Sequence, residues 1–389
     1  MKRMWTAMVS LCLVGELLCA PALAANRQAK QGQQPKVEVQ AKSAILVERE
    51  TGAVLWKQAE HKILEPASVT KVMTMLLTAE AIDRGQIAMD DLVTCSAHAA
   101  SMGGSQVYLR EGEQMTVHDL LKAVAVASGN DAAAALAEYV AGSEPAFVEK
   151  MNQRAEELGM ADTHFCNCNG LPAEGHVTSA WDIALMSRAL LRHESIREFT
   201  GTWMDTLREG TFQLANTNKL IYYYDGATGL KTGSTASAGF CISASALRDG
   251  MELIAVVLGS ETSKERFDTA RNLLDYGFGA YALIDVTPKE PLPEVPVTLG
   301  EQKTVSLLLT EPERKLLVEK AQAGEVTSVA EVPEQVRAPV AQGDRVGVLR
   351  VSIGGKEVKT VPLLAGEDVR RLTFSGIFRD MWRRMATGR

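Results

Sequence analysis

The chain has 389 residues, of which 46% are hydrophobic and 23% are charged, a composition typical of globular proteins with room for a large domain and a smaller second one. Its net charge is −7, so no basic surface is expected for a nucleic-acid partner. Only 5% of its residues are aromatic, which also argues against a base-stacking site.

The first 24 residues have the layout of a secretory signal peptide. Two basic residues at positions 2 and 3 precede an apolar stretch over residues 4–18, and small residues precede an expected cleavage site after Ala24. An uncleaved membrane anchor is the alternative, but the apolar stretch is short for a membrane span. The sequence therefore predicts export, with a flexible leader over residues 25–40.

Cleavage would leave four cysteines in the chain: Cys95, Cys166, Cys168 and Cys241. In an oxidising compartment they could form disulfides, although Cys166 and Cys168 are too close in sequence for an easy bridge. Separate thiols are the other interpretation. The six histidines form no H-E-x-x-H or H-x-H pattern, so neither a metal nor a cofactor is predicted.

The next segment is predicted to have strands at both ends and helices between them. Strands are expected over 43–48 and 53–56 around a turn, and a helical pattern begins at Pro66. Apolar residues at spacings of three and four predict further helices, over 117–127, 132–141, 145–159 and 180–191.

Strand patterns return after Gly229. Two β-rich segments, 239–247 and 251–258, flank a turn, and an amphipathic helix is expected over 266–281. Strands at both ends with helices between them predict one α+β domain over residues 41–285, whose terminal segments share a sheet.

The composition changes near Pro288, where four prolines occur close together. Short Val-rich segments follow around 304–309, 346–353 and 358–363, separated by Gly-containing turns. This pattern predicts a small β-rich domain over residues 286–365.

A terminal helix is expected over residues 366–389, since its last 20 residues, 370–389, have apolar residues at helical spacing and six arginines against one acid, Asp380. A cationic helix with an aromatic apolar face suits the surface of an anionic bilayer. Packing on the β-rich domain or on a partner is the alternative. The membrane surface is favoured because the excess of arginine suits lipid headgroups better than a core.

Three short motifs occur in a specific order. An S-x-x-K motif, Ser68-Val69-Thr70-Lys71, lies at the start of the first long predicted helix. An S-x-N motif, Ser128-Gly129-Asn130, lies on a loop between two predicted helices, and a K-T-G motif, Lys231-Thr232-Gly233, immediately precedes the predicted hairpin. The first two are weak singly, but the ordered trio is typical of penicillin-binding proteins and class A β-lactamases.

The spacing of the first motif suits nucleophilic catalysis. Residues i and i+3 share a helix face, so Lys71 is expected beside Ser68. A serine hydroxyl needs a neighbouring base, and Lys71 can serve if burial and the charge of Lys231 lower its pKa. The N-terminus of the helix adds backbone N–H groups that can stabilise an oxyanion.

The other two motifs suit substrate binding and proton transfer. Ser128 can relay a proton to a leaving amine, and Asn130 can bind an amide of the substrate. Lys231 and Thr232 offer a cation and a hydroxyl to a terminal carboxylate, and Gly233 removes a side chain where a peptide lies along a strand edge. Each residue has an ordinary structural alternative, such as a cap, a solvated charge or a turn former, but the combination predicts acyl transfer.

The sequence around these motifs resembles the low-molecular-mass D-alanyl-D-alanine carboxypeptidases. The similarity covers most of residues 40–285 and, more loosely, the β-rich domain and the terminal helix. It is carried by residues 44–47, 51–52, 64–74, 127–133, 158–160, 163–165, 169–172, 216–220 and 229–233. One departure is Cys166-Asn167-Cys168-Asn169, where the family usually has a loop without cysteines.

The resemblance implies a penicillin-binding or β-lactamase-like α+β catalytic domain. It implies that Ser68 is acylated, that Lys71 is its general base, and that Ser128, Asn130, Lys231, Thr232 and Gly233 line the site. Arg266 lies at the position of the family's carboxylate-binding arginine, with a surface salt bridge as the alternative because Lys264 and Arg271 are close. The oxyanion hole would use the N–H of Ser68 and that of Thr235 or Ser234.

The implied activity is removal of the terminal D-Ala from peptidoglycan stem pentapeptides, without a cofactor, on the outer face of the cytoplasmic membrane. β-Lactams would acylate the same serine. A class A β-lactamase is the nearest alternative, but it needs an E-x-x-L-N glutamate, and Gly159 follows Leu158 after Glu156 and Glu157. A zinc carboxypeptidase is a further alternative, but the sequence lacks the ligand pattern that such an enzyme needs. A non-catalytic penicillin-binding sensor or scaffold is another, but it would have no need of all the intact motif residues.

Overall fold

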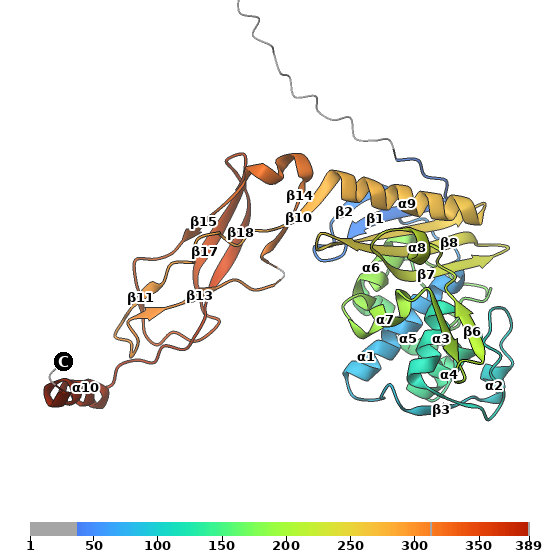
Figure 1. Ribbon diagram of the computed structural model, residues 1–389, viewed down its shortest axis with the longest axis horizontal. Helices are drawn as coiled ribbons and strands as arrows, with labels where there is room; N and C mark the ends of the chain where they lie inside the picture. Colours follow the sequence, from blue (N-terminus) through green and yellow to red (C-terminus); the bar gives the residue numbers. More distant parts are fainter. Residues whose placement is uncertain (1–36, 312, 388–389) are drawn as a thin grey trace, which may run out of the picture. The chain divides into compact units, whose positions relative to one another are not determined.

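The computed structural model describes residues 37–387 except residue 312. The predicted signal peptide and residues 25–36 of the predicted leader lie outside the described residues. A five-stranded antiparallel sheet with the order β2-β1-β9-β8-β7 is central to the part of the chain that carries the three motifs (Figure 1). Its strands are β1 (Ser43–Glu48), β2 (Val54–Gln58), β7 (Ala227–Thr235), β8 (Gly239–Arg248) and β9 (Met251–Ser260).

Helices cover both faces of this sheet, with α9 (Ser263–Ala280) on one side and the helical block on the other (Figure 1). All six residues of β1 are buried because the strand lies between two hydrophobic cores. Ala44 and Leu46 belong to the core that includes α9, whereas Ile45 and Val47 belong to the core of the helical block. Side chains alternate between the faces of a strand, so a strand between two cores is apolar throughout. The α+β prediction, with the terminal segments in one sheet, is confirmed.

The helical block contains the predicted helices with small changes in their bounds. They are α1 (Lys71–Asp83), α3 (Val117–Val126), α4 (Asn130–Ala141), α5 (Glu144–Leu158) and α6 (Ala180–Leu190). Side-chain caps explain several starts: Thr116, Ser143 and Ser179 each accept a hydrogen bond from the N–H three residues later. Thr262 and Glu265 form a capping box, so α9 begins before the predicted Arg266.

Several short elements were not predicted because each has only three to six residues. They are α2 (Ala97–Ala100), α7 (Ser195–Thr200), α8 (Leu220–Tyr223), the hairpin of β3 (Leu92–Thr94) with β4 (Gln114–Thr116), and the hairpin of β5 (Met204–Leu207) with β6 (Phe212–Ala215).

The first motif begins on an element other than the one predicted. Ser68 lies on a 3₁₀ turn, η1 (Ala67–Thr70), and the α-helix itself begins at Lys71. The K-T-G residues precede the β8–β9 hairpin as predicted, and they lie within β7, the first strand of the meander β7-β8-β9. Strand β7 is also at the edge of the sheet, so one side of the third motif is not paired with a strand.

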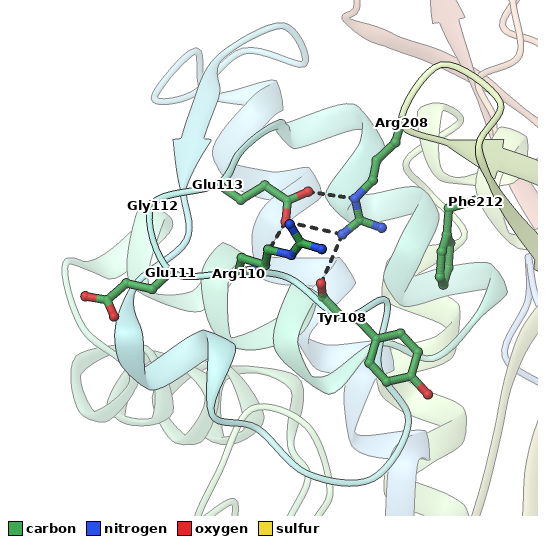
Figure 2. A pocket seen from close by; sticks show the side chains of 7 residues that line it. All are labelled: Tyr108, Arg110, Glu111, Gly112, Glu113, Arg208 and Phe212. Carbon is green, nitrogen blue, oxygen red and sulfur yellow. Dashed lines mark hydrogen bonds and ion pairs between the residues drawn. The ribbon is translucent and has the colours of Figure 1, made fainter.

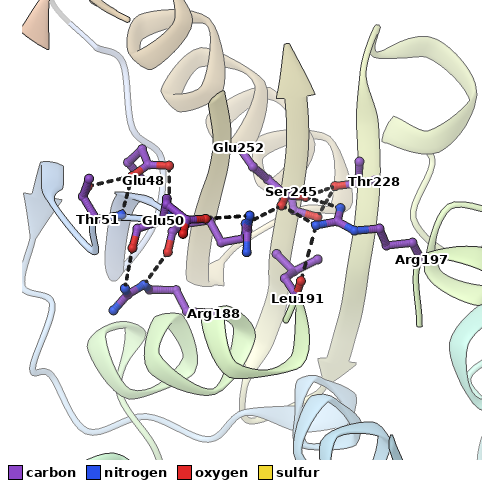
Figure 3. Close-up of polar contacts among 10 residues, drawn as sticks. Glu48, Glu50, Thr51, Arg188, Leu191, Arg197, Thr228, Ser245 and Glu252 are labelled. Atoms are coloured by element: carbon purple, nitrogen blue, oxygen red, sulfur yellow. Dashed lines mark hydrogen bonds and ion pairs between the residues drawn. The ribbon is translucent and has the colours of Figure 1, made fainter. Parts of the chain in front are cut away.

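Two buried carboxylates fix the ends of β1 and β9 (Figure 3). Glu48 accepts two backbone N–H groups and a hydroxyl from the β1–β2 turn. Glu252 contacts Arg197 through two bonds of 2.7 Å and Arg49 at 2.8 Å, and it accepts the hydroxyl of Thr228 at 3.0 Å. Buried charges require such partners. Glu252 thereby ties α7 and the start of β7 to the centre of the sheet.

The segment after residue 280 is rich in β-strands, as predicted. Strands β10 (Tyr281–Asp285) and β14 (Lys315–Glu319) pair with each other. A four-stranded sheet has the order β13 (Leu307–Leu308), β18 (Lys356–Ala365), β17 (Arg345–Ile353) and β15 (Val326–Glu331), and a three-stranded sheet contains β12 (Thr304–Val305), β11 (Val295–Thr298) and β16 (Val336–Arg337). The short 3₁₀ helix η2 (Lys320–Glu325) precedes β15.

The terminal helix α10 (Phe374–Thr387) is also present. Its large apolar residues with described side chains are mostly exposed, namely Phe374, Phe378, Met381, Trp382 and Met385. No helix within residues 37–387 is long and apolar enough to cross a bilayer.

Candidate active site

The three motifs meet around the 3₁₀ turn Ala67–Thr70, which we call the nucleophile turn. Lys71 contacts Asn130 of the second motif at 2.6 Å. A Cβ atom on Gly233 of the third motif would lie 2.7 Å from the backbone nitrogen of Ser68. The fold therefore brings residues from α1, α4 and β7 into one site.

Ser68 is the accessible member of the nucleophile turn. It is half-buried, whereas its neighbours Ala67, Val69 and Thr70 are buried. Ala67 has a φ of 46°, in the left-handed region that residues with a Cβ rarely adopt. Such strain persists only where the surroundings enforce it, and it often occurs at functional sites.

Lys71 is fully buried, and three oxygen atoms surround its amine. Its Nζ lies 3.0 Å from Ser68 Oγ, 2.6 Å from Asn130 Oδ1 and 2.7 Å from the backbone oxygen of Asn169. Burial lowers the pKa of Lys71 to about 7, against the weaker opposing effects of Cys168 and Asp131. A substantial fraction of Lys71 is therefore neutral near pH 7.

The partners of a neutral Lys71 determine where its lone pair points. The oxygen atoms of Asn130 and Asn169 can only accept hydrogen bonds, so they take the two N–H groups of the amine. The orientation of the Asn130 amide is set on its other side, because its Nδ2 donates to the backbone oxygen of Gly103 at 2.7 Å. The remaining lone pair of Lys71 faces the hydroxyl of Ser68, as a general base requires.

The second motif lies on the turn between α3 and α4. Ser128 is buried and has a φ of 63°, and Asn130 is the first residue of α4. Next to them, the buried carboxylate of Asp131 accepts the backbone N–H groups of Val107 and Leu109. The 103–109 loop is thereby attached to the second motif. We did not single out Asp131 for this role, since the sequence does not show which backbone groups it meets.

In the third motif, Lys231 and Thr232 are buried. Burial lowers the pKa of Lys231 well below its ordinary value, and the nearby charges of Lys71 and Arg266 lower it further. The Lys231 amine donates to the backbone oxygen of Thr232 at 3.0 Å, and the Thr232 hydroxyl donates to Thr217 at 2.7 Å. Thr217 was within the sequence resemblance, but we assigned no role to it.

Gly233 packs directly against the nucleophile turn. A Cβ here would lie 2.7 Å from Ser68 N and 2.9 Å from Val69 N, closer than real Cβ atoms approach. The sequence argument attributed this glycine to space for a peptide along the strand. The structure adds a nearer reason, because the turn itself leaves no room for a side chain. Ser234 and Thr235 continue β7 beyond it, and their part in an oxyanion hole stays a prediction.

Arg266 lies on α9 behind the third motif. It is buried, and its guanidinium donates to the backbone oxygens of Gly233 at 3.3 Å and Cys241 at 3.4 Å. Among the described residues its Nε has no hydrogen-bond partner. The surface salt bridge considered as an alternative is formed instead by its neighbours, since Lys264 and Arg271 both pair with Asp268. In this structure Arg266 supports the backbone of the third motif, and its contact with a substrate stays a prediction.

The 165–178 loop completes the site, and the motifs alone did not predict its role. Asn169 supplies the backbone oxygen that holds Lys71, and Gly170 follows with a φ of 86°. A Cβ on Gly170 would lie 2.0 Å from the oxygen of Ala67. The sequence marked this loop by its Asn-Gly pair, a common turn signal, and by the family resemblance of residues 169–172, neither of which shows the contact with Lys71.

This loop also contains the two cysteines that depart from the family pattern. Cys166 is half-buried and Cys168 is fully buried. All four cysteines of the described chain are free thiols, in agreement with the interpretation that they stay separate. Burial raises the pKa of Cys168 well above its ordinary value and that of Cys95 to about 11. These thiols are poor nucleophiles at neutral pH.

A cavity of about 630 Å³ lies beside the 103–109 loop and contains none of the predicted site residues (Figure 2). On one wall Arg208 pairs with Glu113 at 2.7 Å and donates to the backbone oxygen of Val107 at 3.0 Å. The cavity is lined by Tyr108, Arg110, Glu111, Gly112, Glu113, Arg208 and Phe212. Its walls brace the loop that holds Asn130. In the described part of the chain no three His, Cys, Asp or Glu side chains gather as metal ligands.

Comparison with known proteins places this geometry in context. A family model described as D-alanyl-D-alanine carboxypeptidase matches residues 28–262, and one described as penicillin-binding protein 5, C-terminal domain, matches residues 286–371. The chain is 43% identical to the D-alanyl-D-alanine carboxypeptidase DacF of Bacillus subtilis, covering 96% of both proteins. It is 33% identical to DacC of Escherichia coli, covering 88% of this chain and 87% of that protein.

Solved structures of penicillin-binding proteins are also similar to this chain. Penicillin binding protein 5 from Haemophilus influenzae is similar with a TM-score of 0.73 and 29% identity, over 86% of this chain and 98% of that one. Penicillin-binding protein D2 from Listeria monocytogenes, solved in an ampicillin-bound form, is similar with a TM-score of 0.58 and 31% identity, over 63% of this chain and all of that one.

Proposed function

The chain belongs to the D-alanyl-D-alanine carboxypeptidase family, and on that premise we propose that it removes the terminal D-Ala from peptidoglycan stem peptides through an acyl-enzyme at Ser68. The expected penicillin-binding fold with an all-β C-terminal domain is confirmed by the same comparisons. The observation that carries the proposal is the position of the Lys71 amine, which lies 3.0 Å from Ser68 Oγ while the oxygens of Asn130 and Asn169 contact it as well.

Acylation follows from this geometry. Ser68 Oγ attacks the carbonyl carbon of the penultimate D-Ala while its proton passes to Lys71. We expect the backbone N–H of Ser68 to stabilise the negative charge that develops on the carbonyl oxygen. A proton then returns to the leaving amine by way of Ser128, and the terminal D-Ala departs. The products of this step are free D-Ala and an ester of the shortened peptide on Ser68.

The third motif receives the terminal carboxylate of the peptide. Lys231 and Thr232 lie on the edge strand, and their side chains supply a cation and a hydroxyl. Without substrate, burial and neighbouring positive charge disfavour the protonated form of Lys231. A bound carboxylate stabilises that form, so the charge of the site depends on the ligand that it recognises.

Hydrolysis of the ester completes the reaction. Water attacks the acyl carbon, and Lys71, again neutral, takes its proton and returns it to Ser68 Oγ as the ester bond breaks and the shortened peptide leaves. A β-lactam differs because the bond that opens belongs to a ring. Its leaving group stays attached near the ester, and we expect the adduct on Ser68 to be long-lived.

The β-lactamase alternative is not supported by the positions of its candidate glutamates. Glu156 and Glu157 are both exposed near the end of α5, and Glu157 pairs with Arg154. Neither belongs to the set of residues around Ser68, so neither is placed to activate a water molecule for rapid deacylation.

Release of D-Ala tests the proposal. The mature chain, beginning at Ala25, is incubated with a peptide that ends in D-Ala-D-Ala, with and without prior exposure to penicillin. Release that penicillin abolishes is the expected result. Covalent binding of penicillin without release would favour a sensor, and rapid hydrolysis of penicillin would favour a β-lactamase.

We further propose that the chain is exported and attaches to the outer face of the cytoplasmic membrane through α10. The signal-like sequence at residues 1–24 supports export. Exposed aromatic and methionine side chains on α10, together with the arginines in its sequence, suit the boundary of an anionic bilayer.

A further inference from the structure

A chain of hydrogen bonds lies behind the nucleophile turn. None of the residues to which the sequence analysis gave a chemical role takes part in it. His176 of the 165–178 loop is buried, and its Nε2 lies 2.8 Å from the hydroxyl oxygen of Thr70, which is also buried. The Nδ1 of His176 lies 2.9 Å from the backbone nitrogen of Cys166. The hydroxyl of Thr70 donates to the backbone oxygen of Ala67 at 2.8 Å.

The directions of these bonds follow from their partners. The backbone N–H of Cys166 can only donate, so Nδ1 of His176 is the acceptor and carries no proton. The neutral ring then has its proton on Nε2 and donates to Thr70 Oγ. The hydroxyl hydrogen of Thr70 goes to Ala67. A single directed chain therefore runs from Cys166 through His176 and Thr70 to the residue before Ser68.

This chain ends at the strained part of the nucleophile turn. Ala67 has the left-handed φ of 46°, and its carbonyl oxygen is the atom that Thr70 fixes. The same oxygen faces the missing side chain of Gly170 in the 165–178 loop. That loop also holds Lys71 through the backbone oxygen of Asn169. One loop thus determines the position of both the nucleophile and its base.

We propose that His176 is a positioning residue for acylation, which holds the nucleophile turn through Thr70 so that Ser68 stays aligned with Lys71. The inference rests on the proposed function, since it concerns the same reaction. His176 touches no reacting atom, and its effect passes through Ala67 and Thr70.

The protonation state of the ring is consistent with this role. Burial, together with the smaller effect of the charge of His164, lowers the pKa of His176 to about 4. A protonated ring would be a donor at both nitrogens and could not accept from Cys166. The neutral form that the chain of hydrogen bonds requires is therefore the form present at neutral pH.

Paired substitutions separate positioning from general stability. His176→Leu removes both hydrogen bonds, whereas His176→Gln offers an acceptor to Cys166 and a donor to Thr70. Thr70→Val keeps the shape of the side chain and removes the hydroxyl, and Thr70→Ser keeps the hydroxyl. The matched control is His164→Leu, which removes an exposed histidine beside the same loop.

Each variant is assayed for kcat and KM on a D-Ala-D-Ala peptide and for its rate of acylation by penicillin, with kcat expressed per penicillin-reactive site. We expect His176→Leu and Thr70→Val to lose at least about tenfold in kcat and acylation rate, because small misplacements of reacting groups are costly, with little change in KM. His176→Gln and Thr70→Ser recover most of the rate. The His176→Leu/Thr70→Val double variant loses no more than either single one.

The result that overturns the inference is a set of variants with lower thermal stability or fewer reactive sites but unchanged kcat per site. Equal rates for His176→Leu and His176→Gln would also overturn it. The wild-type chain distinguishes this failure from failure of the proposed function, since a wild type that releases no D-Ala refutes the function itself.

Discussion

At the scale of single residues, the amine of Lys71 is the group on which the chemistry depends. Two oxygens that only accept hydrogen bonds hold it on one side, and the hydroxyl of Ser68 lies on the other. The sequence argument expected burial and the charge of Lys231 together to make Lys71 neutral. In the structure burial is the main cause, and the charge repulsion instead contributes to the lowered pKa of Lys231.

The lowered pKa of Lys71 predicts how acylation depends on pH. The base is active when neutral, and burial lowers its pKa to about 7, so the neutral fraction rises as pH increases through that value. We expect the acylation rate with penicillin to fall roughly tenfold per pH unit below about pH 6 and to level off above about pH 8. A rate constant that stays level or decreases from pH 5.5 to 8 would contradict this. Lys71→Arg, which cannot lose its proton at these pH values, should be inactive throughout.

Lys231 is expected to recognise the carboxylate at the end of the substrate. Lys231→Ala should raise KM roughly tenfold to a hundredfold, because a hydrogen bond to a charged group contributes about 1.5–3 kcal/mol. A peptide ending in D-alaninamide lacks the carboxylate and should lose this dependence on Lys231. Lys264→Ala, at an exposed lysine of α9, is the control. Equal loss of affinity for both peptides would exclude the assigned role.

The sequence predicted the side chains of the site better than it predicted the groups that hold those side chains in place. The three motifs identify side chains by type and order, so Ser68, Lys71 and Asn130 could be expected together. The groups that orient them are largely backbone atoms, such as the carbonyls of Gly103 and Asn169. A backbone carbonyl has no signature in sequence, and its role depends on tertiary structure.

At the scale of elements, the long helices were predictable because their apolar periodicity extends over several turns. The 3₁₀ turn at Ser68 was not, since the helical pattern continues through it. Its geometry comes from neighbours distant in sequence, namely Gly170 and Gly233, whose missing side chains make room for it. The short hairpins β3–β4 and β5–β6 have too few residues to show a period of two.

Two glycines of the 165–178 loop allow the contact with the nucleophile turn to be tested. Gly170 and Gly175 both have a left-handed φ, 86° and 80°, so an alanine costs about 1–2 kcal/mol of backbone strain at either. A Cβ at Gly170 would also lie 2.0 Å from Ala67 O, whereas at Gly175 the nearest atom is Cys166 Sγ at 4.0 Å.

We therefore expect Gly175→Ala to lower the free energy of unfolding by about that strain and to keep its kcat per folded molecule. Gly170→Ala should be destabilised further and lose activity, because the turn must move. Denaturant unfolding and penicillin titration measure the two effects. Equal behaviour of the two variants would show that the loop does not constrain the turn.

At the scale of the whole molecule, all residues of the proposed site belong to the part of the sequence that runs from β1 through α9. The β-rich segment and α10 contribute none of them. The change from a mixed pattern to short strands was evident in the sequence because prolines and glycines mark it. What the C-terminal segments do is less evident, since an amphipathic helix suits a membrane, a partner or another domain equally by periodicity alone.

Removal of residues 370–389 tests the proposed membrane attachment. The truncated mature chain should keep its kcat on a soluble peptide within about a factor of two, because its site residues are unchanged. It should no longer sediment with vesicles that contain phosphatidylglycerol, whereas the full mature chain should do so, and less strongly in high salt. Phe378→Ala/Trp382→Ala should weaken binding without truncation. Equal sedimentation of all forms would contradict attachment through α10.

The central claim, acyl transfer through Ser68, is tested most directly by locating the adduct that penicillin forms. The mature chain is labelled to completion, digested, and its peptides are analysed by mass spectrometry, in parallel with Ser68→Ala. We predict one adduct per chain on the peptide that contains Ser68, and neither labelling nor D-Ala release by Ser68→Ala. An adduct on another residue, or labelling that persists in Ser68→Ala, would contradict the account.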